Sequence, residues 1–140
     1  MAFKILIDTN ILIDLLDAKR LNHQAAIDLF NEAENNNLSV FVSESVLNTT
    51  AYLVRKDYSV KQIKDVFQHL LSFVEIIPVN NFTYTAGLQM AVNDLEDAIL
   101  YSAALAKRLD YFITNDIKDL RKIELAALPV MQAKDVLKLI

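Results

Sequence analysis

The chain has 140 residues, of which 54% are hydrophobic, and a formal net charge of -4, with no cysteine and only two histidines. This composition predicts one folded domain, residues 1–140, and excludes a disulfide framework, a cysteine-ligated zinc site and a thiol nucleophile. No apolar run reaches the roughly 18 residues of a membrane span, and the start lacks the long apolar stretch of a secretory signal. We therefore expect a cytoplasmic protein with no membrane contact.

Short apolar runs alternate with helical patterns along the chain. The apolar runs predict buried strands at 3–7, 38–42, 74–79, 111–114 and 128–131. Between them, apolar residues recur at helical spacing over 10–16, 23–35, 43–56, 60–71, 82–92, 94–109 and 134–139. Because parallel strands need helical crossovers, this alternation predicts an α/β fold with a central, mostly parallel sheet of about five strands flanked by helices.

The first acidic residue of interest, Asp8, directly follows the first predicted strand. In open parallel sheets, ligands bind outside the carboxyl ends of the strands, so Asp8 stands where it can bind a cation. Alternatively, Asp8 or Asn10 simply caps the next helix by accepting hydrogen bonds from its free backbone N–H groups. The local sequence leaves both interpretations open.

A second acidic segment opens the predicted helix at 94–109. Asp94 and Asp97 are three residues apart, which places both side chains on one face near the positive end of the helix. The alternative is an N-cap residue followed by an acidic first turn. Glu96 falls on another face, and we expect it to be solvated.

A third segment places Asp116 just beyond the predicted strand at 111–114. The Thr114 hydroxyl is suited to orienting a water molecule or a phosphate. The alternatives are that Asp116 is an ordinary turn residue and that Thr114 only ends the strand.

Together, the three segments make a stronger case than each does alone. Helix caps do not require distant acids to meet at one sheet edge, and such clustering is unfavourable unless a cation compensates the repulsion. Ligation by oxygen alone suits Mg or Mn rather than zinc, and His23 and His69 lie in helical patterns away from these acids.

In their order and spacing, these motifs resemble a PIN domain, the metal-dependent ribonuclease fold of VapC-type toxins in bacterial toxin–antitoxin pairs. The resemblance is carried by the segments at 8–14, 94–99 and 113–116 and by a final strand near 128–130. It implies a three-layer sandwich, a homodimer, an RNA substrate, an antitoxin partner and a Mg or Mn cofactor.

The resemblance also implies roles for individual residues. It assigns Asp8, Asp97 and Asp116 to the catalytic metal site, with Asp94 as a supporting ligand and Asn10 and Thr114 as polar helpers. Water would attack phosphorus in line, with no covalent enzyme intermediate.

The chain departs from the family pattern at one position. The family usually has a Glu one turn or more into the helix after the second strand, where this chain has Asn48 and Thr49. Glu44 lies about one turn earlier and is equally well explained as a first-turn acid. We hypothesise that Asp94 supplies the missing charge. The alternative function is a catalytically weak or inactive PIN-fold module that binds protein or RNA.

The negative net charge disfavours broad attraction of RNA, so RNA contacts must be local. The candidate contacts are Arg55, Lys56, Lys118 and Arg121, each of which is otherwise an ordinary solvated charge.

Other functions of strand-end acids fit the sequence less well. Phosphohydrolases with a nucleophilic Asp need a second acid where this chain has Asn10, and receiver-type domains need an acid after the third strand. The single glycine, Gly87, cannot form a dinucleotide-binding loop.

Overall fold

Five parallel strands form the sheet that the apolar runs predict. In the computed structural model, which describes residues 2–140 and leaves Met1 of the expected domain outside the described residues, they lie in the order β3-β2-β1-β4-β5. The strands are β1 (Phe3–Ile7), β2 (Leu38–Val42), β3 (Val74–Ile76), β4 (Tyr111–Ile113) and β5 (Val130–Met131). Each neighbouring pair is parallel.

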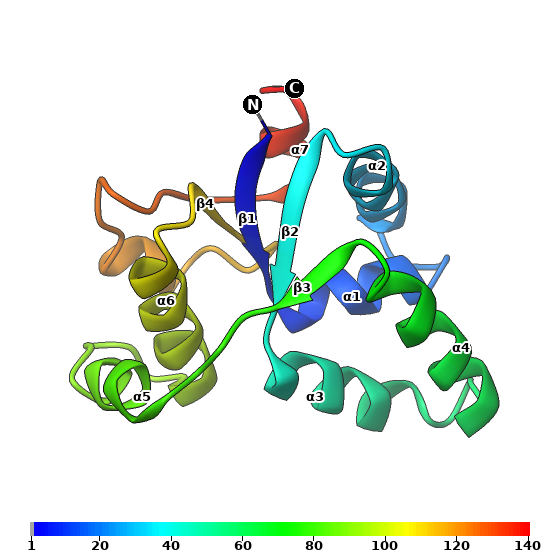
Figure 1. The fold of residues 1–140 in the computed structure, drawn as a ribbon, viewed down its shortest axis with the longest axis horizontal. Coiled ribbons are helices and arrows are strands. Elements are labelled where there is room, and N and C mark those ends of the chain that lie inside the picture. Colours follow the sequence, from blue (N-terminus) through cyan, green and yellow to red (C-terminus); the bar gives the residue numbers. More distant parts are fainter. Residues whose placement is uncertain (1) are drawn as a thin grey trace.

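Helices connect the strands and lie on both sides of the sheet, which confirms the predicted α/β fold (Figure 1). They are α1 (Thr9–Leu16), α2 (His23–Glu34), α3 (Glu44–Val54), α4 (Val60–Leu70), α5 (Asn81–Leu88), α6 (Leu95–Lys107), α7 (Ala133–Leu137) and the short 3-10 helix η1 (Leu120–Lys122). In the view of Figure 1, α5 and α6 lie together to the left of the strands, and α2 and α4 lie to the right. None of the helices between residues 2 and 140 is long and apolar enough to cross a membrane.

Several elements are shorter than the sequence predicts. The third strand, expected at 74–79, ends at Ile76, and only the Ile77 N–H still donates to the Val42 carbonyl, at 2.8 Å. Pro78 follows and has no N–H to extend the ladder. The helix expected at 82–92 ends at Leu88, and the strand expected at 128–131 pairs in the sheet as β5 only at its last two residues.

The centre of the sheet forms the core of the domain. Ile5, Leu6 and Ile7 of β1 are fully buried, as are Phe112 and Ile113 of the adjacent β4. Because helices cover both faces of a parallel sheet, successive residues in the middle of a strand can all be buried and apolar. This explains why Ile5, Leu6 and Ile7 show no alternation of apolar and polar residues, whereas Lys4, near the start of β1, is exposed.

The strand order reverses between β1 and β4, and the candidate site lies at the carboxyl ends of these two strands. The chain leaves β1 toward β2 on one side and returns to β4 on the other, with Ile7 paired with Ile113. The Asp8 N–H donates to the Ile113 carbonyl at 3.2 Å, so the residues that follow both strands begin side by side. In such sheets, ligands bind at the carboxyl ends next to this reversal.

Close packing of α5 on α6 fixes the start of α6 relative to the sheet. The contact depends on Gly87, which is buried against α6. A Cβ at this position would lie 2.9 Å from Ile99 Cα and 3.1 Å from the Ala98 carbonyl oxygen, both backbone atoms. No side chain fits there unless one helix moves.

We therefore expect Gly87→Ala to lower the free energy of unfolding by about 1–3 kcal/mol, despite the better helix propensity of alanine. Urea denaturation followed by circular dichroism measures this change. Thr85→Ala, on the exposed side of the same helix, is the matched control and should leave the stability nearly unchanged. Equal stability of the Gly87→Ala and wild-type proteins would contradict the packing described here.

Candidate functional site

Asp8 is the most buried acid at the sheet edge, with 8% of its surface exposed. Its extended backbone conformation ends β1, and its side chain caps α1 by accepting a hydrogen bond from the Thr9 N–H at 2.6 Å. The other carboxylate oxygen accepts a hydrogen bond from the Thr114 hydroxyl at 3.1 Å. Asp8 is therefore both a helix cap and a fixed carboxylate at the opening of the sheet.

The polar helpers expected from the sequence form a network around Asp8. Asn10 Nδ2 donates to Thr114 Oγ1 at 2.9 Å, and the Asn115 N–H donates to Asn10 Oδ1 at 3.0 Å. Thr114 Oγ1 also accepts a hydrogen bond from the Asp116 N–H at 3.1 Å. Thr114 is fully buried, so its hydroxyl does not face solvent. Its hydrogen bonds instead hold the Asp8 side chain and the Asp116 backbone in place.

The start of α6 brings further acids to this edge. Asp94 caps the helix by accepting a hydrogen bond from the Asp97 N–H at 3.1 Å. Glu96, which we expected to be solvated, instead faces α1, where its Oε1 accepts a hydrogen bond from the Thr9 hydroxyl at 3.3 Å. That prediction was wrong because the docking of α6 beside α1, and not the helix period alone, decides where Glu96 lies.

These acids line one cleft of about 940 Å³, here called the acid cleft. Three segments that are distant in the sequence contribute to it: the end of β1, the start of α6 and the loop after β4. They supply five acids, here called the acid cluster: Asp8, Asp94, Glu96, Asp97 and Asp116. Asp17 and Asp57 also line the cleft.

The electrostatics of the acid cluster show that its members act on one another. Burial raises the pKa of Asp97 to about 7, and the negative charges of Asp8, Asp94, Glu96 and Asp116 contribute to the increase. Burial also raises the pKa of Asp8, with smaller contributions from Glu96 and Asp94 and with opposing hydrogen bonds from Thr9 and Thr114. The cluster therefore carries uncompensated negative charge.

The donor set of the acid cluster fits a hard divalent cation. All its donors are carboxylate oxygens, and a bound cation would offset the repulsion that raises the pKa of Asp97. Between residues 2 and 140, however, no three acidic or histidine side chains are arranged to hold a metal ion. The carboxylates share a cleft without forming a ready-made cage.

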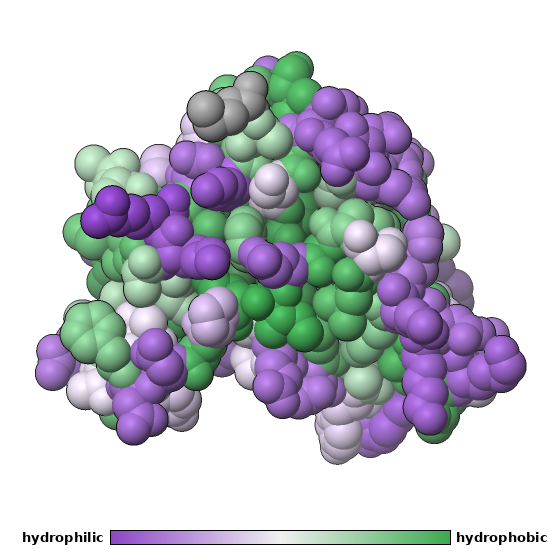
Figure 2. Space-filling view, viewed as in Figure 1, coloured by the Kyte–Doolittle hydropathy of each residue, from purple (hydrophilic) through white to green (hydrophobic). Residues whose placement is uncertain are grey.

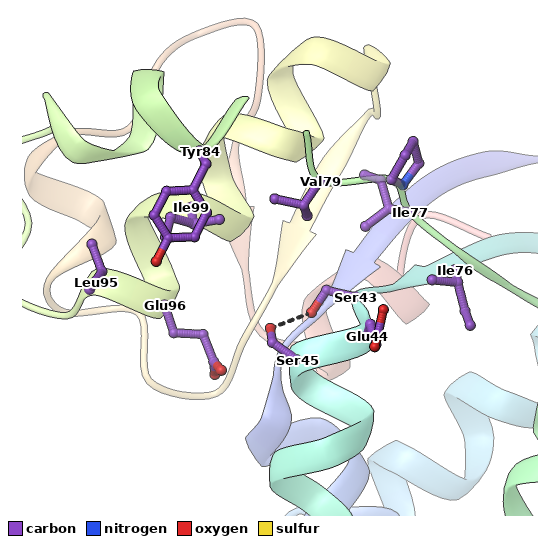
Figure 3. Close-up of a pocket in the computed structure, with 11 residues that line it drawn as sticks. Ser43, Glu44, Ser45, Ile76, Ile77, Val79, Tyr84, Leu95, Glu96 and Ile99 are labelled. Atoms are coloured by element: carbon purple, nitrogen blue, oxygen red, sulfur yellow. Dashed lines mark hydrogen bonds between the residues drawn. The ribbon is translucent and has the colours of Figure 1, made fainter. Parts of the chain in front are cut away.

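Glu44 lies at a neighbouring groove of about 520 Å³, here called the apolar groove, and does not line the acid cleft (Figure 3). Tyr84 and Ile99 form one side of the groove, and Ile77 lies across from them. Glu96 lines both cavities and so joins them.

The residues around Glu44 form the capped start of α3. Ser43 caps α3 by accepting a hydrogen bond from the Val46 N–H at 3.0 Å, and its hydroxyl bonds that of Ser45 at 2.9 Å (Figure 3). Asn48 is exposed and lines neither the acid cleft nor the apolar groove.

The cationic residues of the acid cleft differ from those that the sequence singled out. The lining includes Lys19 and Arg20 but none of the four candidates, Arg55, Lys56, Lys118 and Arg121. The Arg55 guanidinium lies over the Tyr52 ring at 3.7 Å, and Arg121 pairs with Glu124 at 3.9 Å. Arg20 had no signal in the sequence because its position depends on a contact with Asp14 six residues earlier, across the end of a helix.

Comparison with known proteins identifies relatives of both the sequence and the fold. The family model described as PIN domain matches residues 4–118. The chain is 23% identical over 118 residues to Ribonuclease VapC1 of Aquifex aeolicus, covering 81% of each protein.

Among solved structures, the chain resembles VapC20 of Mycobacterium tuberculosis, described as a sarcin–ricin loop cleaving toxin. The TM-score is 0.68, the identity is 16%, and the alignment covers 86% of this chain and 96% of that one. It also resembles a chain of a toxin–antitoxin complex from Klebsiella pneumoniae, with a TM-score of 0.63, 23% identity and coverage of 89% and 94%. At these identities the structures show a shared fold.

The raised pKa of Asp97 predicts a pH-dependent stability in the absence of divalent cations. The folded protein keeps the Asp97 proton up to a pKa of about 7, whereas the unfolded chain loses it near the usual value of 3.8. The stability contributed by this group is therefore largest at low pH and falls as the pH rises through this window.

Asp97→Asn removes this loss, so in EDTA the variant should exceed the wild type in stability by on the order of 1 kcal/mol at a pH of about 8, and by less at about 5. Urea denaturation at several pH values measures the difference. Asp65→Asn, an exposed acid paired with Lys61, should show no such gain. A difference between Asp97→Asn and wild type that does not change with pH would refute the shifted titration.

Proposed function

Because the chain belongs to the PIN domain family, whose model matches residues 4–118, we propose that it is a metal-dependent endoribonuclease that hydrolyses RNA phosphodiesters. The observation that carries this proposal is the acid cluster, which gathers carboxylates from three distant segments at the switch point of the sheet. We further propose that it acts in the cytoplasm as the toxin of a toxin–antitoxin pair. The similarity to VapC1 of Aquifex aeolicus, described as a ribonuclease, supports the same activity.

Asp8, Asp97 and Asp116 would hold Mg or Mn, with Asp94 as a supporting ligand. The cation would offset the negative charge that develops on the phosphate during hydrolysis. The protein's own residues fix the positions of these acids. Thr114 holds the Asp8 carboxylate and the Asp116 backbone, and Asn10 links the segment after β1 to the segment after β4. Such fixed positions matter because catalysis depends on preorganised charge.

The Glu that the family usually has in the helix after the second strand is missing here, near Asn48. Glu96 supports the proposal because it can replace the negative charge of that residue. Its carboxylate lines the acid cleft, whereas Glu44 does not. Together with Asp94, it can supply the negative charge that the helix Glu supplies in other members of the family. Asn48 is exposed and takes no part in the cleft.

The second candidate function is an inactive PIN-fold module that binds RNA or protein. It is favoured by the missing helix Glu and by the lack, within residues 2–140, of a preformed metal cage. The two candidates differ in one outcome, since only the nuclease cuts RNA in the presence of Mg or Mn.

We propose an antitoxin and a second copy of this chain as its protein partners. The similarity to a chain of the Klebsiella pneumoniae toxin–antitoxin complex supports the antitoxin. Large apolar side chains left exposed on α5, Phe82 at 78% and Leu88 at 57%, support a partner-covered surface. Figure 2 shows further apolar side chains at the centre of the displayed face, over β3 and the segment after it.

The purified protein should cleave single-stranded RNA in the presence of Mn or Mg and leave 5′-phosphate ends. EDTA should stop the reaction, and Asp8→Asn and Asp97→Asn should each lower the rate at least about 100-fold, because each removes charge that the cation requires. Gel analysis of end-labelled RNA measures both effects.

Asp65→Asn, at an exposed acid that does not line the acid cleft, is the control for loss of one negative charge and should cleave at the wild-type rate. RNA binding without any cleavage, by a folded wild-type protein in Mn, would favour the inactive module. Cleavage that persists in both Asp8→Asn and Asp97→Asn would exclude the acid cluster as its origin.

Asp94→Asn tests the supporting charge. Its cap can still accept a hydrogen bond from the Asp97 N–H, so the helix start should persist while one charge is lost. Isothermal calorimetry should show Mn binding weakened by about 10-fold, since outer ligands typically contribute 10–100-fold in metal affinity. Unchanged affinity would show that Asp94 acts only as a helix cap.

A further inference from the structure

Arg20 occupies an unusual position, as a cation on the wall of a cleft dominated by acids. It lies in the segment between α1 and α2, lines the acid cleft together with Asp8, Asp97 and Asp116, and leaves 42% of its side chain exposed. Its Nε donates to Asp14 Oδ1 at 2.6 Å. The guanidinium is therefore held at one nitrogen, Nε, on a side chain that stays partly exposed at the cleft.

The carboxylate that holds Arg20 is itself fixed. Asp14 lies in α1, and its side chain is only 3% exposed. Its second oxygen accepts a hydrogen bond from Asn115 Nδ2 at 2.5 Å, and its backbone carbonyl oxygen lies 2.7 Å from His23 Nδ1. Asn115 directly precedes Asp116 and is bound to Asn10, so Arg20 is linked to the same network that positions the acid cluster.

The free side of the guanidinium suits a phosphate. Between residues 2 and 140, the Arg20 side chain makes a hydrogen bond through Nε alone, to Asp14. Its two terminal nitrogens have no hydrogen-bond partner there. A guanidinium carries five N–H donors in a planar fork, and the four on its terminal nitrogens match the oxygens of a phosphodiester.

Within the part of the chain that the structure describes, Lys19, the second cation of the lining, has no comparable anchor for its ammonium group. The contact that fixes it involves its backbone N–H, which donates to Asp17 Oδ1 at 3.0 Å.

We propose that Arg20 binds a backbone phosphate of the RNA next to the one that is cut, and that Asp14 is its positioning residue. The inference rests on the proposed nuclease function and adds to it the phosphate contact that an acidic protein requires. A polyanion entering a cleft lined by carboxylates needs a local positive charge. Arg20 supplies that charge at the wall, while a cation bound by the acid cluster would face the scissile phosphate.

The competing explanation is that Arg20 only neutralises the buried Asp14. A buried carboxylate left without its partner destabilises a protein strongly, so a change in stability alone does not separate the two roles. The double variant Asp14→Asn/Arg20→Gln removes both charges together and leaves no unpaired buried ion. Arg20→Lys keeps the charge but loses the planar fork.

The test measures the binding of a fluorescently labelled single-stranded RNA in Mg, by anisotropy, with every protein carrying Asp97→Asn to prevent cleavage. Arg20→Gln and the double variant should bind about 10-fold more weakly than the parent, and the slope of log affinity against log salt should fall by about 0.7, the value for one phosphate contact on a single strand. Arg20→Lys should lose about 3-fold in affinity and keep the slope.

Lys61→Gln removes one positive charge from an exposed ion pair on α4 and is the matched control, with no expected change in affinity or slope. In the cleaving protein, Arg20→Gln should raise KM more than it lowers kcat.

Parent-level affinity and salt slope in the double variant would overturn the phosphate contact and leave Arg20 with a structural role, whatever the stability of Arg20→Gln. If the wild type does not cut RNA and the parent protein does not bind it, the proposed nuclease function fails and takes this inference with it. If the wild type cuts RNA and Arg20→Gln keeps its KM, only the inference fails.

Discussion

The carboxylate of Asp8 is almost buried at the edge of the sheet, and the rest of the site depends on how its charge is tolerated there. The Thr9 N–H and the Thr114 hydroxyl donate hydrogen bonds to it, and both lower its pKa against the stronger effect of burial. The two donors come from α1 and from the end of β4, so the bonds that stabilise the charge also join the two strands at the reversal of strand order. The same hydrogen bonds thus stabilise the Asp8 charge and hold the ends of β1 and β4 together.

In this fold, two residues cap helices and also belong to the acid cluster. Asp8 caps α1 and Asp94 caps α6, yet both side chains line the acid cleft. A helix N-terminus stabilises a nearby negative charge, so two caps that meet at one sheet edge can hold more acids than an isolated loop can. The remaining repulsion is visible in the pKa of Asp97, which is raised to about 7.

The sheet and its acidic edge could be predicted from the sequence because each depends on short-range patterns. An apolar run followed by an acid, as at Ile7 and Asp8, marks the end of a buried strand, and parallel strands bring such ends to one side. Glu96 could not be placed in this way, because its contact with Thr9 spans 87 positions and depends on how α6 docks. The contact between Asp14 and Asn115 spans 101 positions and is equally invisible to periodicity.

The ion pair of Asp14 and Arg20 bears on a conflict that the proposed nuclease function creates in an acidic cleft. Carboxylates are needed to hold a cation, and a positive side chain is needed to receive phosphate, but a mobile arginine would pair with the carboxylates and block both roles. Here a buried carboxylate outside the acid cluster takes the Nε of Arg20 at 2.6 Å. Because Asp14 is rigidly held by Asn115, the guanidinium stays at the wall of the cleft. The terminal nitrogens then remain available to a ligand, and the guanidinium does not neutralise the acid cluster that would bind a cation.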